Sequence, residues 1–303
     1  MPNTLAHIGI QTPLTKLGIK EAPLQWIVVG CIIPDIPWIV QRIFTHLPGI
    51  DLLPLRLYSV TQASLVYCLI LSLALAMLAD KSKQIFLILA TNSLVHLLLD
   101  ASQKKWGNGV NLFVPFSWHT TYFGFVWPEH FINYIFTFMG LITLAVLWSK
   151  AIQNTRLLSK PDRAKTVCAV SCLVFYFCSP YLLLNSAYEA NIHYCKTLSE
   201  TTTRSGKVIE LDRTQYQATT NTLKCYIGTD IRIANPPTIE SGTISVRGRF
   251  LDEKTITLEK YHTHQISRDY SSYIGLILAL LLWVHTFCYQ KNRPNTNTDR
   301  DTK

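Results

Sequence analysis

Five apolar runs dominate this sequence and restrict the folds open to it. Each is close to the roughly 20 residues that a helix needs to cross a lipid bilayer. Hydrophobic residues make up 49% of the 303 residues and charged residues only 16%, which is too apolar for an ordinary soluble domain. We therefore expect a mainly α membrane protein with about five transmembrane helices, over residues 62–79, 83–99, 130–149, 166–184 and 272–289.

A further apolar run, over residues 24–44, is interrupted by Pro34, Asp35 and Pro37. Proline removes a backbone donor, and non-helical backbone at membrane depth has to be buried in protein. The interruption predicts a broken or re-entrant helix near the N-terminus rather than a clean span. The N-terminal residues also lack the basic region, apolar core and cleavage site of a secretory signal.

The basic residues gather in three segments that flank the apolar runs. If five spans alternate, all three segments fall on one side of the membrane, and the positive-inside rule makes that side cytoplasmic. The C-terminus is then cytoplasmic, whereas residues 1–61, 100–129 and 185–271 lie on the outer face. A true span over residues 24–44 would move only the N-terminus to the inside. The basic residues are Lys81 and Lys83; Lys150, Arg156, Lys160, Arg163 and Lys165; and Lys291, Arg293, Arg300 and Lys303.

Residues 185–271 differ from the apolar runs and have the pattern of short alternating strands separated by turn residues such as Gly206 and Pro236. This pattern predicts a small antiparallel sheet or barrel of about 80 residues, an extracytoplasmic domain inserted before the last helix. Its acidic and basic residues nearly balance, which does not favour nucleic-acid binding. We expect strands over residues 207–212, 224–233, 242–250 and 254–264.

Cys195 and Cys225 are the only cysteines of this segment. On an oxidising outer face they could form a disulfide that closes a loop of about 30 residues. The alternative is that both remain free thiols, and the sequence leaves the two alternatives equally open.

These patterns divide the chain into four parts. Residues 1–149 form a helical, membrane-embedded region, and residues 150–184 form a basic cytoplasmic loop and a transmembrane helix. Residues 185–271 form the β-rich domain, and residues 272–303 form the last transmembrane helix with a basic cytoplasmic tail.

His96 and Asp100 stand four residues apart at the end of an apolar run, so a helix places both on one face. An imidazole and a carboxylate on successive turns can ligate one divalent metal ion, or they can form a buried hydrogen bond. Ionisable groups in such a segment are costly and usually face a bundle interior or a functional cavity. His7 and Asp35 lie in apolar surroundings too, and a carboxylate there needs a partner such as a metal or an imidazole.

The N-terminal half resembles a known family. Its motifs, in chain order, are His7, Pro34-Asp35, Thr61-Gln62-Ala63-Ser64 opening a helix, His96-x-x-x-Asp100, and Pro115-Phe116-Ser117-Trp118. Over about residues 1–130 this order is similar to the LexA-regulated, inner-membrane-associated metal-dependent hydrolases (the YdjM-like family). That family is distantly similar to zinc-dependent phospholipase C and to S1/P1-type nucleases, which are helical and bind zinc through His and Asp. The family pattern has Thr-His-Ser where this chain has Thr61-Gln62-Ala63.

The resemblance implies a metal-dependent hydrolase of the bacterial inner membrane that uses a divalent metal, zinc above all. The metal ligands would be His7, Asp35, His96 and Asp100, with Gln62 as a weaker ligand, because an amide oxygen binds zinc less well than an imidazole. Glu129 could serve as a weaker ligand or as a general base.

The loop over residues 101–130 is rich in Trp and Phe, which suit the headgroup depth of a bilayer, and it contains Lys104 and Lys105. A phosphoester of a lipid or of a lipid-linked intermediate is therefore the expected substrate class. A plain aromatic belt without catalytic duty explains the loop equally well.

Two other classes of function remain open. A non-catalytic membrane protein would keep the polar cluster as a structural or decayed metal site, and its β-rich domain would bind a partner protein. The Gln62 substitution is the best argument for this alternative. A transporter would use Asp35 and His96 as intramembrane proton carriers, but the sequence shows no inverted repeat.

Overall fold

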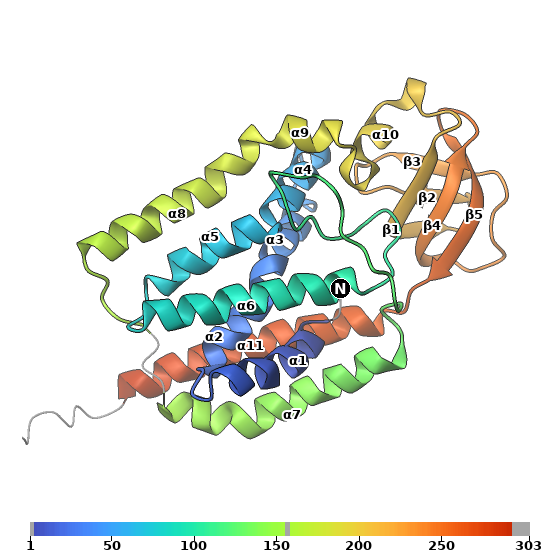
Figure 1. Cartoon of the computed structure of the whole chain (residues 1–303). Helices are drawn as coiled ribbons and strands as arrows, with labels where there is room; N and C mark the ends of the chain where they lie inside the picture. The colour runs from blue at the N-terminus through green and yellow to red at the C-terminus, as the bar shows by residue number, and fades with distance from the viewer. Residues whose placement is uncertain (1–2, 155–157, 293–303) are drawn as a thin grey trace, which may run out of the picture.

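The computed structural model describes residues 3–154 and 158–292, and shows a layer of helices with a small β-barrel at one end (Figure 1). Short 3-10 turns occupy Ile33–Asp35, Ile192–Tyr194 and Thr201–Thr203. The expected mostly helical fold with a small sheet region is confirmed. The helices are α1 (Thr4–Gly18), α2 (Leu24–Ile32), α3 (Ile36–Phe44), α4 (Leu52–Gln62), α5 (Leu65–Ala76), α6 (Ser82–Ala101), α7 (Phe131–Asn154), α8 (Arg163–Leu182), α9 (Leu184–Glu189), α10 (Cys195–Ser199) and α11 (Ser267–Asn292).

Five helical segments of the described chain are long and apolar enough to cross a membrane. Four of them coincide with expected runs, and the last begins at Ser267, a few residues earlier than expected. The fifth is the N-terminal segment over residues 24–44, which the sequence assigned to a broken or re-entrant helix. The five segments are Leu24–Phe44, Ser82–Ala101, Phe131–Gln153, Arg163–Leu182 and Ser267–Lys291.

The segment over residues 24–44 has the predicted interruption, as the 3-10 turn between α2 and α3, but a sharper break lies at the start of the expected span over residues 62–79. Helices α4 and α5 meet at an angle of 70° and would make a sixth span only if the bent pair is counted as one. The break lies at Ser64, whose extended backbone (φ −75°, ψ 161°) ends one helix and begins the next. Pro34 and Pro37 disturb the chain less, because each stands in the first turn of its helical segment, where the missing N–H is not needed.

The barrel lies at one end of the helical layer (Figure 1), and lysine residues gather around a cavity at the opposite end, called the basic end below. Lys16, Lys81 and Lys150 line one cavity at the basic end. Because α1 runs from the barrel end to this cavity, residues 16–24 lie at the end opposite the barrel, which differs from the expectation that all of residues 1–61 lie on the same face as residues 185–271. Arg156, Arg293, Arg300 and Lys303 lie outside the described residues.

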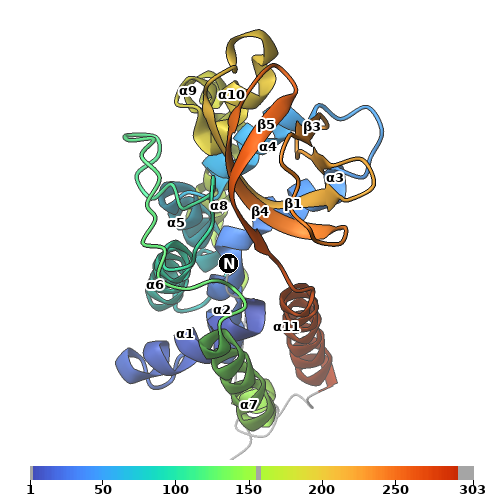
Figure 2. The same ribbon diagram turned by 90° about the vertical axis from the view of Figure 1, so that its right-hand side faces the viewer.

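The β-rich segment folds into a closed five-stranded barrel with the order β1-β2-β3-β5-β4. All neighbouring strands are antiparallel except β3 and β5. The expected strand over residues 224–233 is divided in two, because a turn with Gly228 at φ +83° separates β2 from β3. Figure 2 looks onto the barrel from its end of the molecule. The strands are β1 (Val208–Gln217), β2 (Thr222–Lys224), β3 (Asp230–Ile233), β4 (Gly242–Phe250) and β5 (Thr255–Thr263).

Cys195 and Cys225 are both free and buried, which settles the two alternatives against a disulfide. The Cys195 sulfur lies 3.5 Å from the hydroxyl of Tyr226 instead. Burial raises the pKa of the Cys225 thiol to about 12, so this thiol stays protonated and unreactive at neutral pH.

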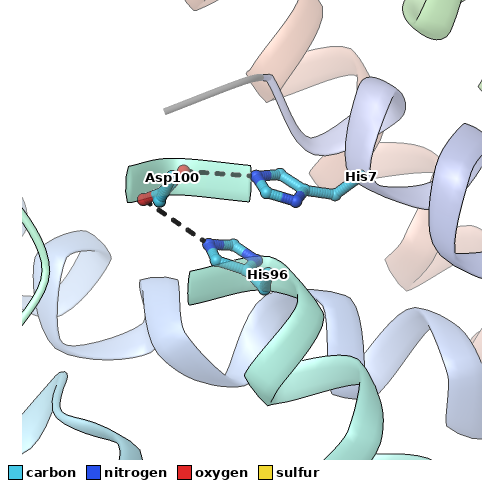
Figure 3. Close-up of side chains that lie close together, drawn as sticks. All are labelled: His7, His96 and Asp100. Carbon is cyan, nitrogen blue, oxygen red and sulfur yellow. Dashed lines mark ion pairs between the residues drawn. The ribbon is translucent and has the colours of Figure 1, made fainter. Parts of the chain in front are cut away.

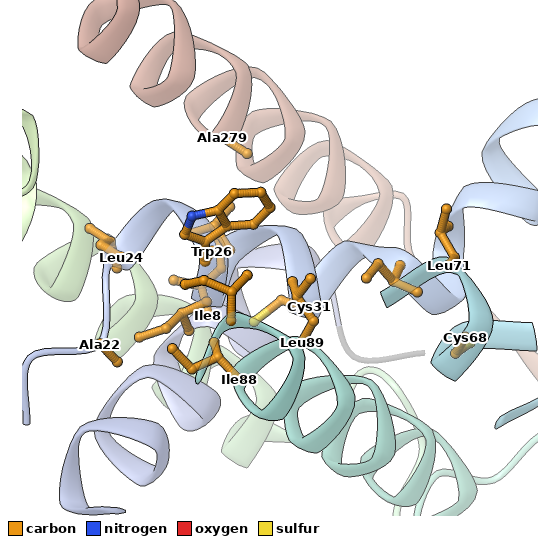
Figure 4. Close-up of a cluster of buried hydrophobic side chains, with 14 of the residues drawn as sticks. Ile8, Ala22, Leu24, Trp26, Cys31, Cys68, Leu71, Ile88, Leu89 and Ala279 are labelled. Atoms are coloured by element: carbon orange, nitrogen blue, oxygen red, sulfur yellow. The ribbon is translucent and has the colours of Figure 1, made fainter. Parts of the chain in front are cut away.

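The apolar core of the helical layer joins α1, α2, α5, α6 and α11 (Figure 4). Segments Leu24–Phe44 and Ser82–Ala101 are half-buried within it, whereas the other three candidate spans are only 17–22% buried. The outer faces of α7, α8 and α11 expose large apolar side chains such as Phe138, Phe175 and Leu280. Segments Leu24–Phe44 and Ser82–Ala101 can therefore hold polar side chains in the interior of the helical layer.

Helix α1 lies unusually close to α7 and α11. A Cβ atom at Gly140 would lie 2.0 Å from the carbonyl oxygen of Leu5, and one at Gly9 would lie 2.3 Å from the carbonyl oxygen of Phe136. On the other side, a Cβ at Gly275 would lie 2.8 Å from Cβ of Thr4. Glycine thus permits the close approach that sets the position of the polar residues on α1.

Candidate metal centre

Four of the five expected metal ligands meet in the interior, beneath the barrel end of the helical layer. His7 comes from α1, Asp35 from the 3-10 turn, and His96 and Asp100 from α6. Figure 3 shows both imidazoles facing the Asp100 carboxylate. The two histidine side chains are fully buried, and Asp100 and Asp35 expose only 8% and 14% of theirs. The two imidazoles are thus shielded from bulk water, whereas the carboxylates keep a narrow exposure.

The orientation of His96 is fixed by the backbone of the interrupted helix. Its Nδ1 lies 2.6 Å from the carbonyl oxygen of Cys31, in the turn before Pro34. A carbonyl only accepts, so Nδ1 carries a proton, and in the neutral ring the Nε2 lone pair faces Asp35 Oδ1 at 3.6 Å and Asp100 Oδ2 at 3.9 Å. Metal-bound histidines typically make this kind of hydrogen bond with their second nitrogen.

His7 is held from the other side by Gln11. The amide nitrogen of Gln11 donates to its Nδ1 at 3.1 Å, so in the neutral ring Nε2 carries the proton and faces Asp100 Oδ1 at 3.5 Å. Metal ligation through Nε2 requires the other tautomer, in which Nδ1 donates to the amide oxygen of Gln11 after this amide has turned over. The rings of His7 and His96 are parallel within 1°, with centroids 3.7 Å apart. Two parallel rings pointing the same way bring both Nε2 atoms to the same carboxylate.

The atoms that converge are buried and lack hydrogen-bond partners. These atoms are Nε2 of His7, Nε2 of His96, Oδ1 of Asp35 and Oδ1 of Asp100. The two Nε2 atoms lie 3.5–3.9 Å from the carboxylate oxygens of Asp35 and Asp100, which is too long for charge-assisted hydrogen bonds, which span about 2.7–2.9 Å. Two ligand atoms on one tetrahedral zinc ion lie about 3.4 Å apart. The donor set and its spacing therefore fit a divalent cation, and His7, His96 and Asp100 form a group that could hold one.

Lys105 is a further charged group at the cluster. Its Nζ lies 3.3 Å from Oδ2 of Asp100, and its side chain is 6% exposed. The sequence placed Lys105 on an interfacial loop as a site of phosphate attraction; the structure places its ammonium beside the buried carboxylate. No signal in the local sequence marks this contact, because the loop folds back over the end of α6.

Gln62 and Glu129 are not part of this cluster. The amide nitrogen of Gln62 donates to the hydroxyl of Tyr58 and to the carbonyl of Tyr176, both at 3.2 Å, so it joins α4 to α8. This placement corrects the expectation of a fifth ligand. Glu129 is bound to the barrel strand β5 and its C-terminal extension, which corrects the expectation of a general base at the metal centre.

Glu129, His262 and His264 form a second group that could hold a metal ion. Here the contacts are direct, with Glu129 Oε1 2.7 Å from His264 Nδ1 and Oε2 3.2 Å from His262 Nε2. Arg213 approaches the same carboxylate at 3.8 Å, and Trp127 stacks on His262 at 3.7 Å. Because the Glu129 carboxylate already forms hydrogen bonds with both imidazoles, we interpret this group as a link between the barrel and the loop before α7, called the latch below.

Glu129 carries a pH dependence that can be measured. Burial by itself would raise its pKa, but the hydrogen bonds from His262 and His264 outweigh burial and hold its pKa well below the usual range. A depressed carboxyl pKa stabilises the fold fully at neutral pH, and this contribution is lost as the pH falls below about 4, the range of a free glutamate.

We expect Glu129→Gln to lower the free energy of unfolding by about 2 kcal/mol at pH 7. The difference from wild type should persist down to about pH 4 and shrink at lower pH. Thermal unfolding in detergent at several pH values measures both effects, with the exposed Glu240→Gln as the matched control. Equal unfolding temperatures of the two variants at pH 7 would show that the latch contributes nothing.

No protein-family model, no curated protein and no solved structure matches this chain. The residues that sequence reasoning missed at the metal centre are Gln11, the Cys31 carbonyl and Lys105. Gln11 stands one helical turn after His7, and this spacing is a local signal that could have indicated the contact.

Proposed function

We propose that this chain is a multi-pass protein of the bacterial inner membrane, with the barrel outside and the C-terminus in the cytoplasm. Support comes from the five long apolar helical segments and from the exposed apolar faces of α7, α8 and α11. The gathering of Lys16, Lys81 and Lys150 at the end opposite the barrel agrees with the positive-inside rule.

We further propose that it is a metal-dependent hydrolase acting on a phosphoester of a lipid or a lipid-linked intermediate at the outer membrane surface. The observation that carries this proposal is the convergence of the His7, His96 and Asp100 side chains, a buried group that could hold a metal ion, with Asp35 beside His96 at 3.6 Å. Two imidazoles and two carboxylates favour zinc among common divalent metals. The resemblance of the same motifs to those of the YdjM-like hydrolases supports the same proposal.

The protein groups around the centre have separate tasks in such a reaction. A divalent ion bound there supplies a polarised phosphoryl oxygen and a water of lowered pKa. The Cys31 carbonyl and Gln11 hold the two imidazoles in position. Lys105, beside Asp100, can donate to an oxygen of the substrate phosphate, and burial of the cluster excludes competing water.

Hydrolysis of defined lipids tests the proposal. Protein loaded with zinc in mixed micelles should release inorganic phosphate from phosphatidic acid or a headgroup from phosphatidylglycerol, and a chelator should stop the release. Asp35→Asn should lower the rate by about 100-fold or more, because it removes a ligand charge. Asp51→Asn, at the exposed start of α4, is the matched control. A rate that neither the chelator nor Asp35→Asn changes would exclude this function.

The ion pair between Lys105 and Asp100 favours a second candidate, a purely structural polar cluster in a non-catalytic protein. In that case Lys105 would serve as the internal cation that balances the buried carboxylate. Lys105→Met would then destabilise the fold by about 3 kcal/mol, and added zinc would not restore the stability. A metal site predicts the opposite: zinc should raise the unfolding temperature of both wild type and variant.

A further inference from the structure

A cavity of about 470 Å³ lies between the helical layer and the barrel, and it reaches the metal centre at Asp100. Its floor is formed by α3, α4 and α6 with the loop that carries Lys105. The barrel and the turn after β2 supply the roof, through Asp212, Arg213, Gln215, Tyr226 and Thr243. The barrel is thus part of the wall of the site.

Positive charge predominates around this cavity. Its lining includes the cationic residues Arg42, Arg56, Lys105, Arg213 and Arg268, against the acidic residues Asp100, Asp212 and Asp269. Asp269 is shared between Arg213, at 2.7 Å, and Arg268, at 3.5 Å. Over residues 3–154 and 158–292, Arg42 and Arg56 form no ion pair.

Arg56 is fixed in place although no carboxylate holds it. Its guanidinium lies 4.6 Å from the ring of Trp38 and 4.6 Å from the ring of Tyr226, so it is stacked between the helical layer and the barrel. Its Nη2 lies 3.0 Å from Nδ1 of His193. Burial, then the charges of Arg56 and Lys105, hold the pKa of His193 well below its usual value, so this ring adds no charge of its own.

A second cavity, of about 330 Å³, adjoins the first between α3 and α11 and reaches the metal centre from the other side, at Asp35. Trp38, Arg42, Arg268, Asp269 and Tyr273 line both cavities. Arg42 donates to the hydroxyl of Tyr273 at 2.9 Å, at the junction of the two.

Away from this junction the lining of the second cavity becomes apolar, with Ile39, Ile43 and Leu276. Ile43 is 61% exposed, on the face where α3 also exposes Val40 and Phe44. The second cavity is therefore a groove that opens onto the apolar surface of the helical layer.

We propose that the two cavities together bind one phospholipid, with its phosphate in the polar cavity and an acyl chain in the groove between α3 and α11. The inference rests on the proposed hydrolase function and names the substrate class and its orientation. Arg42, Arg56 and Lys105 bind the phosphate, which lies beside Asp100 and Asp35. The barrel closes over the headgroup, so its docking is required for binding.

Fluorescence quenching by brominated lipids tests this arrangement, because Trp38 lines both cavities and bromine quenches tryptophan only at short range. Protein in a neutral maltoside detergent, treated with a chelator so that nothing is hydrolysed, is titrated with phosphatidic acid that carries brominated acyl chains. Saturable quenching is expected, and Trp38→Phe should remove most of it. Brominated diacylglycerol, which lacks the phosphate, should require at least about 10-fold higher concentrations.

Arginine variants test the part of the site that is proposed to bind the lipid phosphate. Arg42→Gln and Arg56→Gln should each weaken phosphatidic acid binding by about 10-fold. Arg249→Gln, on the barrel away from both cavities, should leave it unchanged. Equal binding of phosphatidic acid and diacylglycerol would overturn the assignment of the cations.

Competitors test the acyl-chain half. Inorganic phosphate and glycerol 3-phosphate should displace the lipid only at concentrations at least about 100-fold higher than unlabelled phosphatidic acid. Displacement at equal concentrations would show an anion site without an acyl-chain groove. Metal content and lipid binding are also measured together on zinc-loaded samples that received no chelator: lost lipid binding with metal retained rejects this inference alone, whereas lipid binding by protein that takes up no zinc rejects the hydrolase and keeps the lipid site.

Discussion

Divalent-metal affinity should fall by more than about 100-fold when His96 is replaced by alanine. His96 is the ligand whose orientation is best determined, because Nδ1 is bound to the Cys31 carbonyl and Nε2 faces both carboxylates. The substitution removes a donor and leaves Asp35 and Asp100 without an imidazole between them. Isothermal titration calorimetry, in which zinc is added to the chelator-treated protein, measures the change in zinc affinity.

His193→Ala is the matched control for this experiment, since His193 is also a buried histidine at the barrel end of the molecule. It lies against Arg56 rather than at the carboxylates, so zinc affinity should stay within a few-fold of wild type. An equal loss of affinity in both variants would mean that the effect comes from general disruption of the fold. Unchanged affinity in His96→Ala would remove His96 from the ligand set.

Replacing Gly140 with leucine should have the second-largest effect, although this residue lies on α7 and contacts no ligand. Any side chain there would collide with the carbonyl oxygen of Leu5, and α1 would have to move away from α7. We expect a loss of about 3 kcal/mol in unfolding free energy. We also expect zinc affinity to fall at least 10-fold, because α1 carries His7.

Gly18→Leu provides the control for that change. Gly18 ends the same helix, and a Cβ atom there would meet nothing within 4 Å. Its unfolding temperature and zinc affinity should match wild type. Normal zinc affinity in Gly140→Leu, with the fold retained, would show that the cluster does not depend on the position of α1.

The sequence predicted the helical class and the barrel segment, because each has a local signature, and the resemblance pointed to the four residues of the candidate metal centre. Apolar runs of span length and alternating strands are visible within short windows, and His96 and Asp100 share a helix face by spacing alone. Asp35 stood out because a carboxylate between prolines in an apolar run needs a partner.

Other features depend on contacts between distant segments and have no such signature. Lys105 reaches Asp100 only because the following loop folds back, and Gly140 matters only because Leu5 packs on it. The same applies to Glu129, which was expected to be a weaker ligand or a general base. Its partners His262 and His264 lie more than 130 residues away, so the latch appears only when the barrel is in place.

The sequence predicted the interruption within residues 24–44, where the 3-10 turn Ile33–Asp35 separates α2 from α3, but it did not predict the sharper bend at Ser64. Proline is the strongest local sign of an interruption, and Pro34 and Pro37 suggested one within residues 24–44. In the first turn of a helical segment proline does little harm, and this segment is still long and apolar enough to span. The sharper bend lies at Ser64, where the neighbouring residues carry no strong helix-breaking signal.

X-ray absorption spectroscopy of the zinc-loaded protein tests the central claim most directly, because it reports the ligand atoms themselves. A site made by His7, Asp35, His96 and Asp100 predicts a first shell of nitrogen and oxygen at about 2.0–2.2 Å with the outer scattering of two imidazoles. The spectrum of Asp100→Ala should lose this pattern. A sulfur shell at about 2.3 Å, or the absence of bound zinc after loading, would contradict the assignment.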